Sequence, residues 1–166
     1  EGEAVQGEVK GDALDLTLIA TRPFSGDGIK MQDLEVIENG KLRTIHGSTP
    51  FCRYLGIEPT GVYDKTKCNN EGSVSFEDMK KTPCLWTVAF SDFQMDTFTG
   101  HFGGEIRLAY LIENGKVTPV TGGSINGNLI EAQRNMLFSK DRFVSANYEG
   151  PYAVKLFDIP VAGTAN

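Results

Sequence analysis

The sequence predicts an α+β protein with a predominantly antiparallel β-sheet, or a barrel-like arrangement of strands, and two or three short helices. The pentapeptide Ile-Glu-Asn-Gly-Lys occurs twice, at Ile37–Lys41 and at Ile112–Lys116. Asn-Gly between apolar runs is a strong hairpin signal, because a two-residue type I′ turn needs φ > 0 at both central positions. Apolar residues also alternate along Ala13–Ile19, and aromatic and β-branched residues dominate Leu85–Phe93. Both patterns are typical of strands.

The two predicted hairpins have four arms, which are Leu34–Ile37, Leu42–Ile45, Ile106–Ile112 and Lys116–Val120. Two explanations of the repeated pentapeptide stay open. It reflects an internal duplication, or it is a favourable turn sequence that arose twice.

Three short helices are expected from their end signals. The first runs from an N-cap at Thr49 to a terminating Gly56. The second begins at Ser75, where Asp in place of Glu completes a capping pair, and continues to Lys81. The third is expected over Asn128–Phe138, where apolar residues share one helical stripe.

The remaining segments are expected to be loops and a closing strand. Residues Glu58–Gly72 are polar and predict a long surface loop, and the glycine-rich stretch Thr99–Gly104 is expected to interrupt the sheet. The tail Tyr152–Val161 alternates again and predicts a last strand, which brings the expected total to about eight strands.

Length and composition predict one domain over residues 1–166, and they disfavour some kinds of binding partner. The net charge is −6, so the sequence lacks the excess of positive charge that is typical of nucleic-acid binding. No apolar run approaches the ~18 residues that a membrane span needs, so no membrane partner is expected. Cys52, Cys68 and Cys84 form an odd set without Cys-x-x-Cys spacing, which argues against a disulfide framework or a zinc ribbon and favours a reducing compartment.

The residues themselves predict no complete catalytic, cofactor-binding or metal site. His46 and His101 are the two histidines, and neither has a partner at zinc-ligand spacing. His101 and Glu105 could provide at most half of the ligands of a metal site. The better interpretation is that His101 is an ordinary polar residue of a loop. Asp92 and Asp96 have the chemistry of an acid–base pair, but the sequence does not place them together.

A succession of segments runs through nearly the whole sequence in a recognisable order. These segments are Ile37-Glu-Asn-Gly-Lys-Leu, Ser48-Thr-Pro-Phe-Cys-Arg-Tyr-Leu-Gly, Glu58-Pro-Thr-Gly, Phe98-Thr-Gly-His-Phe-Gly-Gly-Glu, Ala109-Tyr-Leu-Ile-Glu-Asn-Gly-Lys-Val-Thr-Pro-Val, Ile125-Asn-Gly-Asn-Leu and Pro160-Val-Ala-Gly. In this order they resemble the C-terminal domain of the TldD/PmbA family, once called modulators of DNA gyrase. The most specific part of the resemblance is the succession from Thr99-Gly to Gly127-Asn-Leu.

The resemblance implies a family of zinc metalloproteases that act on peptides or unfolded segments. Such proteins are typically cytoplasmic, and the best-known pair forms a TldD–PmbA heterodimer in peptide maturation and antitoxin degradation. In the active subunit, a His-Glu-x-x-x-His helix of the N-terminal domain binds zinc, and a cysteine of the C-terminal domain completes the ligand set.

This sequence departs from that pattern in two ways. It contains no His-Glu-x-x-x-His helix, and the family cysteine is expected in the window Asn147–Pro151, where none occurs. The cysteine nearest to the window along the sequence is Cys84, in a different segment. No catalytic, cofactor or metal residue of the family therefore carries over to this protein. The departure favours a non-metal subunit that partners an active one over a wrong alignment of the last segment.

The expected function is that of a TldD/PmbA-type C-terminal domain without metal ligands. It would shape the cavity, support a homo- or heterodimer, and hold a peptide or unfolded segment at a sheet edge. Three alternatives stay open: the second half of a zinc peptidase with a cryptic ligand such as His101, a non-catalytic peptide-binding or partner module, and a stand-alone extracellular domain with a signal peptide before Glu1.

Overall fold

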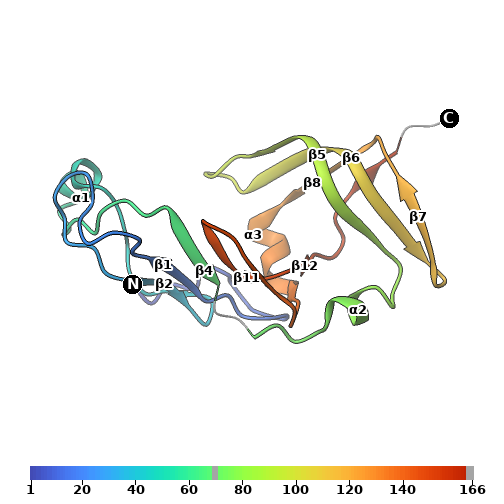
Figure 1. Ribbon diagram of the computed structural model, residues 1–166, viewed down its shortest axis with the longest axis horizontal. Coiled ribbons are helices and arrows are strands. Elements are labelled where there is room, and N and C mark those ends of the chain that lie inside the picture. Colours follow the sequence, from blue (N-terminus) through green and yellow to red (C-terminus); the bar gives the residue numbers. More distant parts are fainter. Residues whose placement is uncertain (69–70, 164–166) are drawn as a thin grey trace.

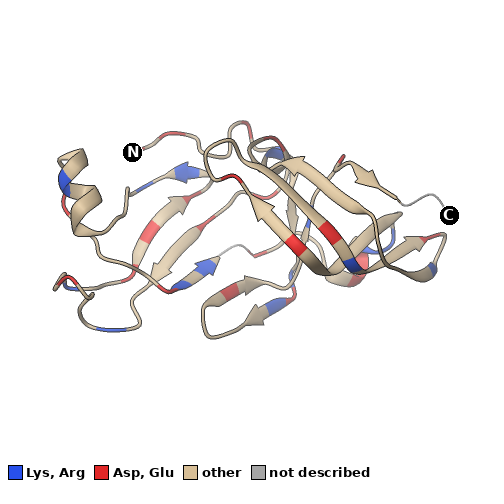
Figure 2. Ribbon diagram, turned by 90° about the horizontal axis from the view of Figure 1, so that it is seen from above, with Lys and Arg blue, Asp and Glu red and all other residues tan. Residues whose placement is uncertain are grey.

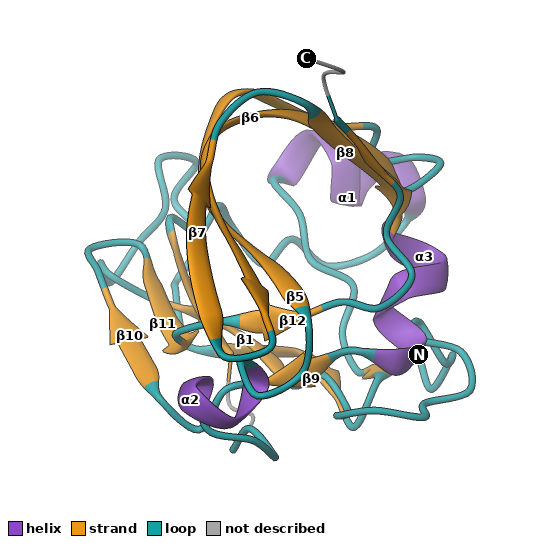
Figure 3. Cartoon of the chain, turned by 90° about the vertical axis from the view of Figure 1, so that its right-hand side faces the viewer, coloured by secondary structure: helices purple, strands orange, loops and turns teal. Residues whose placement is uncertain are grey.

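A computed structural model describes residues 1–68 and 71–163 of the protein and contains two main β-sheets with short helices around them (Figure 1). Antiparallel pairing dominates, and the second sheet curves without closing into a barrel (Figure 3). The predicted α+β class with short helices is therefore confirmed.

The first sheet has six strands in the order β10-β11-β4-β1-β2-β3. Neighbours are antiparallel except β11 and β4, which run parallel. The strands are β1 (Leu16–Ile19), β2 (Leu34–Glu38), β3 (Lys41–Leu42), β4 (Lys65–Cys68), β10 (Arg142–Val144) and β11 (Tyr148–Pro151).

The second sheet is built around one long strand, β6, and runs in the order β13-β8-β6-β5. β6 pairs with β5 along its length, with β8 at its beginning and with β7 at its end. The strands are β5 (Cys84–Met95), β6 (His101–Glu113), β7 (Lys116–Val120), β8 (Ser124–Asn128) and β13 (Val161–Ala162). A separate antiparallel pair consists of β9 (Leu137–Phe138) and β12 (Val154–Lys155).

Both predicted hairpins are present, and their turns have the predicted geometry. Asn39 and Gly40 have φ of 49° and 70°, and Asn114 and Gly115 have φ of 50° and 74°. These left-handed conformations join β2 to β3 and β6 to β7, as type I′ turns require.

The first two helices are close to their predicted positions. α1 (Thr49–Leu55) ends at Gly56 in the left-handed conformation, but its N-cap is Ser48 rather than Thr49. α2 (Phe76–Met79) begins after the predicted cap, where the Ser75 hydroxyl accepts a hydrogen bond from the Asp78 N–H.

The third predicted helix is much shorter than expected. α3 (Leu129–Ala132) and the 3-10 turn η1 (Gln133–Asn135) end before Met136. Leu137 and Phe138 then form β9, so the prediction of a helix to Phe138 is wrong. Tertiary packing is the physical reason, because Met136 and Phe138 are buried in the core and β9 pairs with β12.

Three further expectations are corrected by sheet pairing. The expected loop Glu58–Gly72 contains strand β4, which pairs with β1 and β11, while positions 69–70 lie outside the described residues. The stretch Thr99–Gly104 does not interrupt the sheet, because β6 already begins at His101. The tail Tyr152–Val161 forms short pieces of strand rather than one continuous strand.

A compact apolar cluster lies beneath the first sheet. Buried Cys68, Met136 and Phe138 form it, with Tyr148 packed against it. The fully buried Gln6 ties the N-terminal segment to this region, because its amide donates to the carbonyls of Asp12 and Gln133.

The protein exposes more surface than a compact monomer of its mass. Its accessible surface is 10655 Å² at 18.1 kDa, whereas a folded monomer of that mass exposes about 8,100 Å². Lys and Arg residues are scattered over the molecule rather than gathered on one face (Figure 2). Among the described residues, no helix has the length and apolar character needed to cross a membrane.

Candidate functional site

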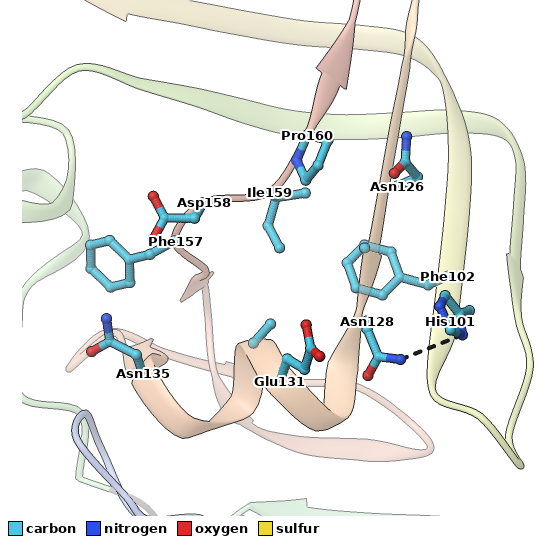
Figure 4. Close-up of a pocket in the computed structure, with 12 residues that line it drawn as sticks. His101, Phe102, Asn126, Asn128, Glu131, Asn135, Phe157, Asp158, Ile159 and Pro160 are labelled. Atoms are coloured by element: carbon cyan, nitrogen blue, oxygen red, sulfur yellow. Dashed lines mark hydrogen bonds between the residues drawn. The ribbon is translucent and has the colours of Figure 1, made fainter.

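Two hollows lie beside the beginning of β6 and share His101, Phe102 and Asn126 in their walls. The first has a volume of about 500 Å³ and lies between β8, α3 and the segment before β13 (Figure 4). The second has a volume of about 640 Å³ and lies along the end of β5 and the beginning of β6. Both hollows are open to solvent.

Local hydrogen bonds hold the start of β6 in place between the hollows. The Asp96 carboxylate accepts from the Phe98 N–H at 2.8 Å and from the Thr99 hydroxyl at 2.7 Å, which closes the turn between β5 and β6. Asn128 accepts from the Ile130 N–H at 2.9 Å and so caps α3, while its amide donates to the Thr99 carbonyl at 2.9 Å. The turn and the helix are thereby fixed to one another.

His101 is an exposed side chain between these two anchors. Its Nδ1 lies 3.2 Å from the Thr99 hydroxyl and 3.4 Å from the Asn128 amide nitrogen (Figure 4). The imidazole borders both hollows, so a molecule in either one would meet it.

Glycines allow aromatic rings to pack closely against the strands beside the site. A Cβ at Gly104 would come within 2.8 Å of the rings of Phe90 and Phe93, and a Cβ at Gly127 within 2.7 Å of Phe102. Phe102 and Phe93 stack with ring centroids 6.0 Å apart. Gly104 and Gly127 therefore allow close packing across the strands.

The charge of the site is negative. Among the described lining residues of the two hollows, five are carboxylates and none is Lys or Arg: Asp92, Asp96, Glu105, Glu131 and Asp158. The Thr99 hydroxyl, followed by the backbone amides of Phe98 and Thr99, lowers the pKa of Asp96. Asp96 is therefore an ionised carboxylate that stabilises the turn. An ionised carboxylate has no proton to donate, so Asp96 is unsuited to the role of general acid.

The residue pairs considered from the sequence do not form reactive pairs. Asp92 and Asp96 line the same hollow, but Asp92 accepts from Gln94 while Asp96 closes its own turn. His101 and Glu105 are four positions apart on one strand, a separation of roughly 13 Å that prevents a shared metal ion. His46 is exposed in the segment before α1, outside both hollows.

Sequence reasoning missed the first hollow because its wall comes from separate segments. Asn126 and Asn128 lie on β8, Glu131 on α3, and Asp158 on the segment before β13. Asp158 has φ of 55°, a left-handed conformation unusual outside glycine, which the sequence does not mark.

The outer edge of β5 is the most extended open feature near the site. Within the described sheets, β5 has twelve residues and pairs only with β6, so its opposite edge has no neighbouring strand. Residues 91–95 are exposed, and three of them line the second hollow: Asp92, Gln94 and Met95. Phe93 and Met95 are 49% and 41% exposed, which provides apolar surface beside the open backbone edge.

Comparison with known proteins gives this arrangement a family. Residues 8–163 match the model of the PmbA/TldA metallopeptidase C-terminal domain. The chain belongs to this family. The resemblance seen in the sequence is therefore confirmed, and the family's C-terminal domain extends over nearly the whole length.

Solved structures share the same fold as this PmbA/TldA domain. A proposed modulator of DNA gyrase from Bacteroides thetaiotaomicron matches 98% of the chain with a TM-score of 0.77 and 22% identity. A proposed modulator of DNA gyrase from Thermotoga maritima matches 95% with a TM-score of 0.71 and 23% identity. TldE from Thermococcus kodakarensis matches 98% with a TM-score of 0.76 and 20% identity. No curated protein matches the sequence.

The chain spans well under half of each solved relative, with coverage of 39%, 40% and 41% of their lengths. The family is one of metallopeptidases, so a zinc site must be tested against the residues present. The part of the protein that the structure describes contains no group of three or more His, Cys, Asp or Glu side chains that fits a metal ion. These residues do not fit a zinc centre by themselves.

The cysteines of this PmbA/TldA domain lie in packed positions. Cys52 is buried on α1, and Cys84 is half-buried at the start of β5, where its thiol faces the Met79 carbonyl. Cys68 is buried on β4 rather than exposed in a polar loop. It packs against Gly150 of the window in which the family cysteine was expected, because a Cβ at Gly150 would lie 2.9 Å from the Cys68 Cβ.

Proposed function

We propose that this protein is the peptide-holding and subunit-contacting domain of a PmbA/TldA-type zinc metallopeptidase that cleaves peptides or unfolded segments. Membership of the metallopeptidase family supports the activity of the whole protein. The lack of a fitting ligand group among the described residues supports a role for this domain outside metal binding. The zinc would then be held by residues beyond this domain.

The observation that carries the proposal is the open edge of β5 beside the hollow that contains Asp92 and His101. An edge strand presents unpaired N–H and C=O groups, and an extended peptide can join the sheet through them. Backbone pairing needs no particular side chain on the peptide, which suits a peptidase that accepts varied unfolded segments. The exposed Phe93 and Met95 would contact apolar side chains of such a peptide.

A subunit contact is supported by the accessible surface area and by an apolar patch at the α1 end of the molecule. The accessible surface exceeds that of a compact monomer by roughly 2,600 Å². This excess is larger than the area that a single partner buries in an interface of standard size. We call the exposed apolar side chains around α1 the α1-end patch, which consists of Phe24, Ile45, Phe51, Tyr54, Leu55 and Val62. Asp27 connects the loop of Phe24 to Thr49 of α1, so these segments converge (Figure 1).

Amide hydrogen exchange with an unstructured peptide of alternating apolar and polar residues tests the peptide-holding role. We expect saturating peptide to protect the β5 amides that face the open edge, while those of β10, the short strand at one end of the other sheet, exchange as before. Equal exchange of β5 with and without peptide would reject this role.

Metal analysis of the native full-length gene product separates the peptidase from the partner-module alternative. Zinc together with peptide cleavage would support the peptidase, whereas a zinc-free product bound to a second, zinc-containing subunit would support a non-catalytic partner. We also propose a cytoplasmic location, which the odd number of cysteines and their spacing support.

A further inference from the structure

The two Ile-Glu-Asn-Gly-Lys segments provide an internal comparison. Both place Asn-Gly in a hairpin turn, and their dihedral angles are nearly equal, with φ of 49° and 50° at Asn39 and Asn114. The local sequence and the turn geometry are therefore matched, and only the surroundings of the two turns differ.

The first turn is held by the rest of the protein. The Asn39 N–H donates to Asp15 Oδ1 at 2.6 Å, and the Gly40 N–H donates to the Leu14 carbonyl at 2.9 Å. The Gly40 carbonyl in turn accepts from the Gln6 N–H at 3.2 Å, and Gly40 is buried. The amide of Gly40 is thus both bonded and screened from water.

The second turn is open on all sides. Asn114 and Gly115 are exposed, and within residues 1–68 and 71–163 the structure gives the Gly115 N–H no hydrogen-bond partner. A Cβ at Gly115 would find nothing within 4 Å, so the space beside this glycine is open. Fraying of the exposed hairpin end is the motion that such a turn permits.

We propose that Asn114 is a site of spontaneous deamidation and isoaspartate formation, and that Asn39 is protected from the same reaction. The backbone nitrogen of Gly115, after losing its proton to solvent, attacks Cγ of Asn114. The new N–C bond forms as the bond between Cγ and the Asn114 amide nitrogen Nδ2 breaks, and ammonia leaves with a proton from water. Water then opens the succinimide at either carbonyl and yields aspartate or isoaspartate.

The product changes the hairpin in two physical ways. Isoaspartate routes the backbone through the former side-chain carbons and adds one methylene to a two-residue turn, which disturbs the Glu113–Lys116 pairing at the end of β6 and β7. The new carboxylate also adds a negative charge beside Glu113. The reaction therefore loosens β7 with time, without any enzyme.

Peptide mass mapping of the intact protein at mildly alkaline pH tests the proposal. Trypsin releases Asn39 in a peptide that ends at Lys41 and Asn114 in one that ends at Lys116, so each site is measured separately. We expect Asn114 to deamidate at least about tenfold faster, because two hydrogen bonds must open before Gly40 can react. Equal rates in the folded protein, or a faster reaction at Asn39, would overturn the proposal.

Two controls separate structure from sequence. In denaturant the two sites should react at the same rate, because their pentapeptides are identical, and a persisting difference would overturn the structural explanation. The variant Asp15→Ala removes the acceptor for the Asn39 N–H and should speed deamidation of Asn39 while leaving Asn114 unchanged. An unchanged Asn39 rate in folded Asp15→Ala protein would also count against the proposal.

Discussion

Gly127 lies directly against the ring of Phe102, because a Cβ at position 127 would come within 2.7 Å of Phe102 Cζ. This contact joins β8 to β6 at the wall of the first hollow. We expect Gly127→Ala to lower the free energy of unfolding by about 1–3 kcal/mol, as overpacking does in a closed site. Gly103→Ala is the matched control, since its Cβ would meet its nearest neighbour at 3.7 Å. Urea unfolding with the same loss for both variants would contradict the packing account.

The N-caps of α1 and α2 provide a second matched pair. The Ser75 hydroxyl accepts from the Asp78 N–H at 3.1 Å, whereas the Ser48 side chain makes no capping hydrogen bond. We expect Ser75→Ala to cost about 1 kcal/mol of stability and Ser48→Ala to stay within about 0.5 kcal/mol. Thermal unfolding of both variants checks this, and an equal shift would show that the α2 cap has no special role.

Asp27 should contribute to stability in a pH-dependent way. Hydrogen bonds from the Ser25 hydroxyl, and then from Thr49, hold its pKa well below the usual range. A lowered pKa in the folded state means that the contribution is complete above the unfolded pKa and is lost as pH falls below about 4. We therefore expect the unfolding free energy of Asp27→Asn to fall less steeply at acid pH than that of the native protein.

The control for Asp27 is Glu58→Gln, because Glu58 is exposed and its replacement removes the same charge. Unfolding free energies measured by urea titration from neutral pH downward provide the comparison. If both substitutions reduce the acid-pH loss of unfolding free energy equally, overall charge explains the effect and the Asp27 hydrogen bonds do not.

The α1-end patch predicts the effect of polar substitutions on assembly. Phe51 and Tyr54 are 73% and 91% exposed, so Phe51→Ser with Tyr54→Ser should leave folding stability within about 0.5 kcal/mol per site. We expect the native full-length protein carrying both changes to sediment at the mass of a single subunit. Val144→Ser, at an exposed apolar site on β10, should keep the assembled mass. A double variant with the assembled mass would contradict the subunit-contact role.

Local signals in the sequence were sufficient for both hairpin turns and for the caps of α2 and α3, whereas the cap of α1 lies one residue before the predicted Thr49. Asn39-Gly40 and Asn114-Gly115 specify their own dihedral angles, and Ser75 satisfies an amide three residues away. Such interactions involve neighbours in the sequence and need no knowledge of the tertiary structure.

Elements that depend on distant partners could not be predicted in the same way. β4 has the polar sequence Lys-Thr-Lys-Cys and exists because β1 and β11 lie on either side of it. Phe138 lies in a strand rather than a helix because it is buried with Cys68, a residue far away in the sequence. The first hollow likewise joins Asp158 to Asn128, a proximity that no local pattern marks.

The most direct test of the central claim is the binding of an unstructured peptide and of the same peptide N-methylated at alternate residues. N-methylation removes the backbone donors on one edge but keeps every side chain. If the open edge of β5 holds substrate by strand addition, the native domain should bind the unmodified peptide and lose affinity for the methylated one. Equal affinity for both peptides would contradict the account.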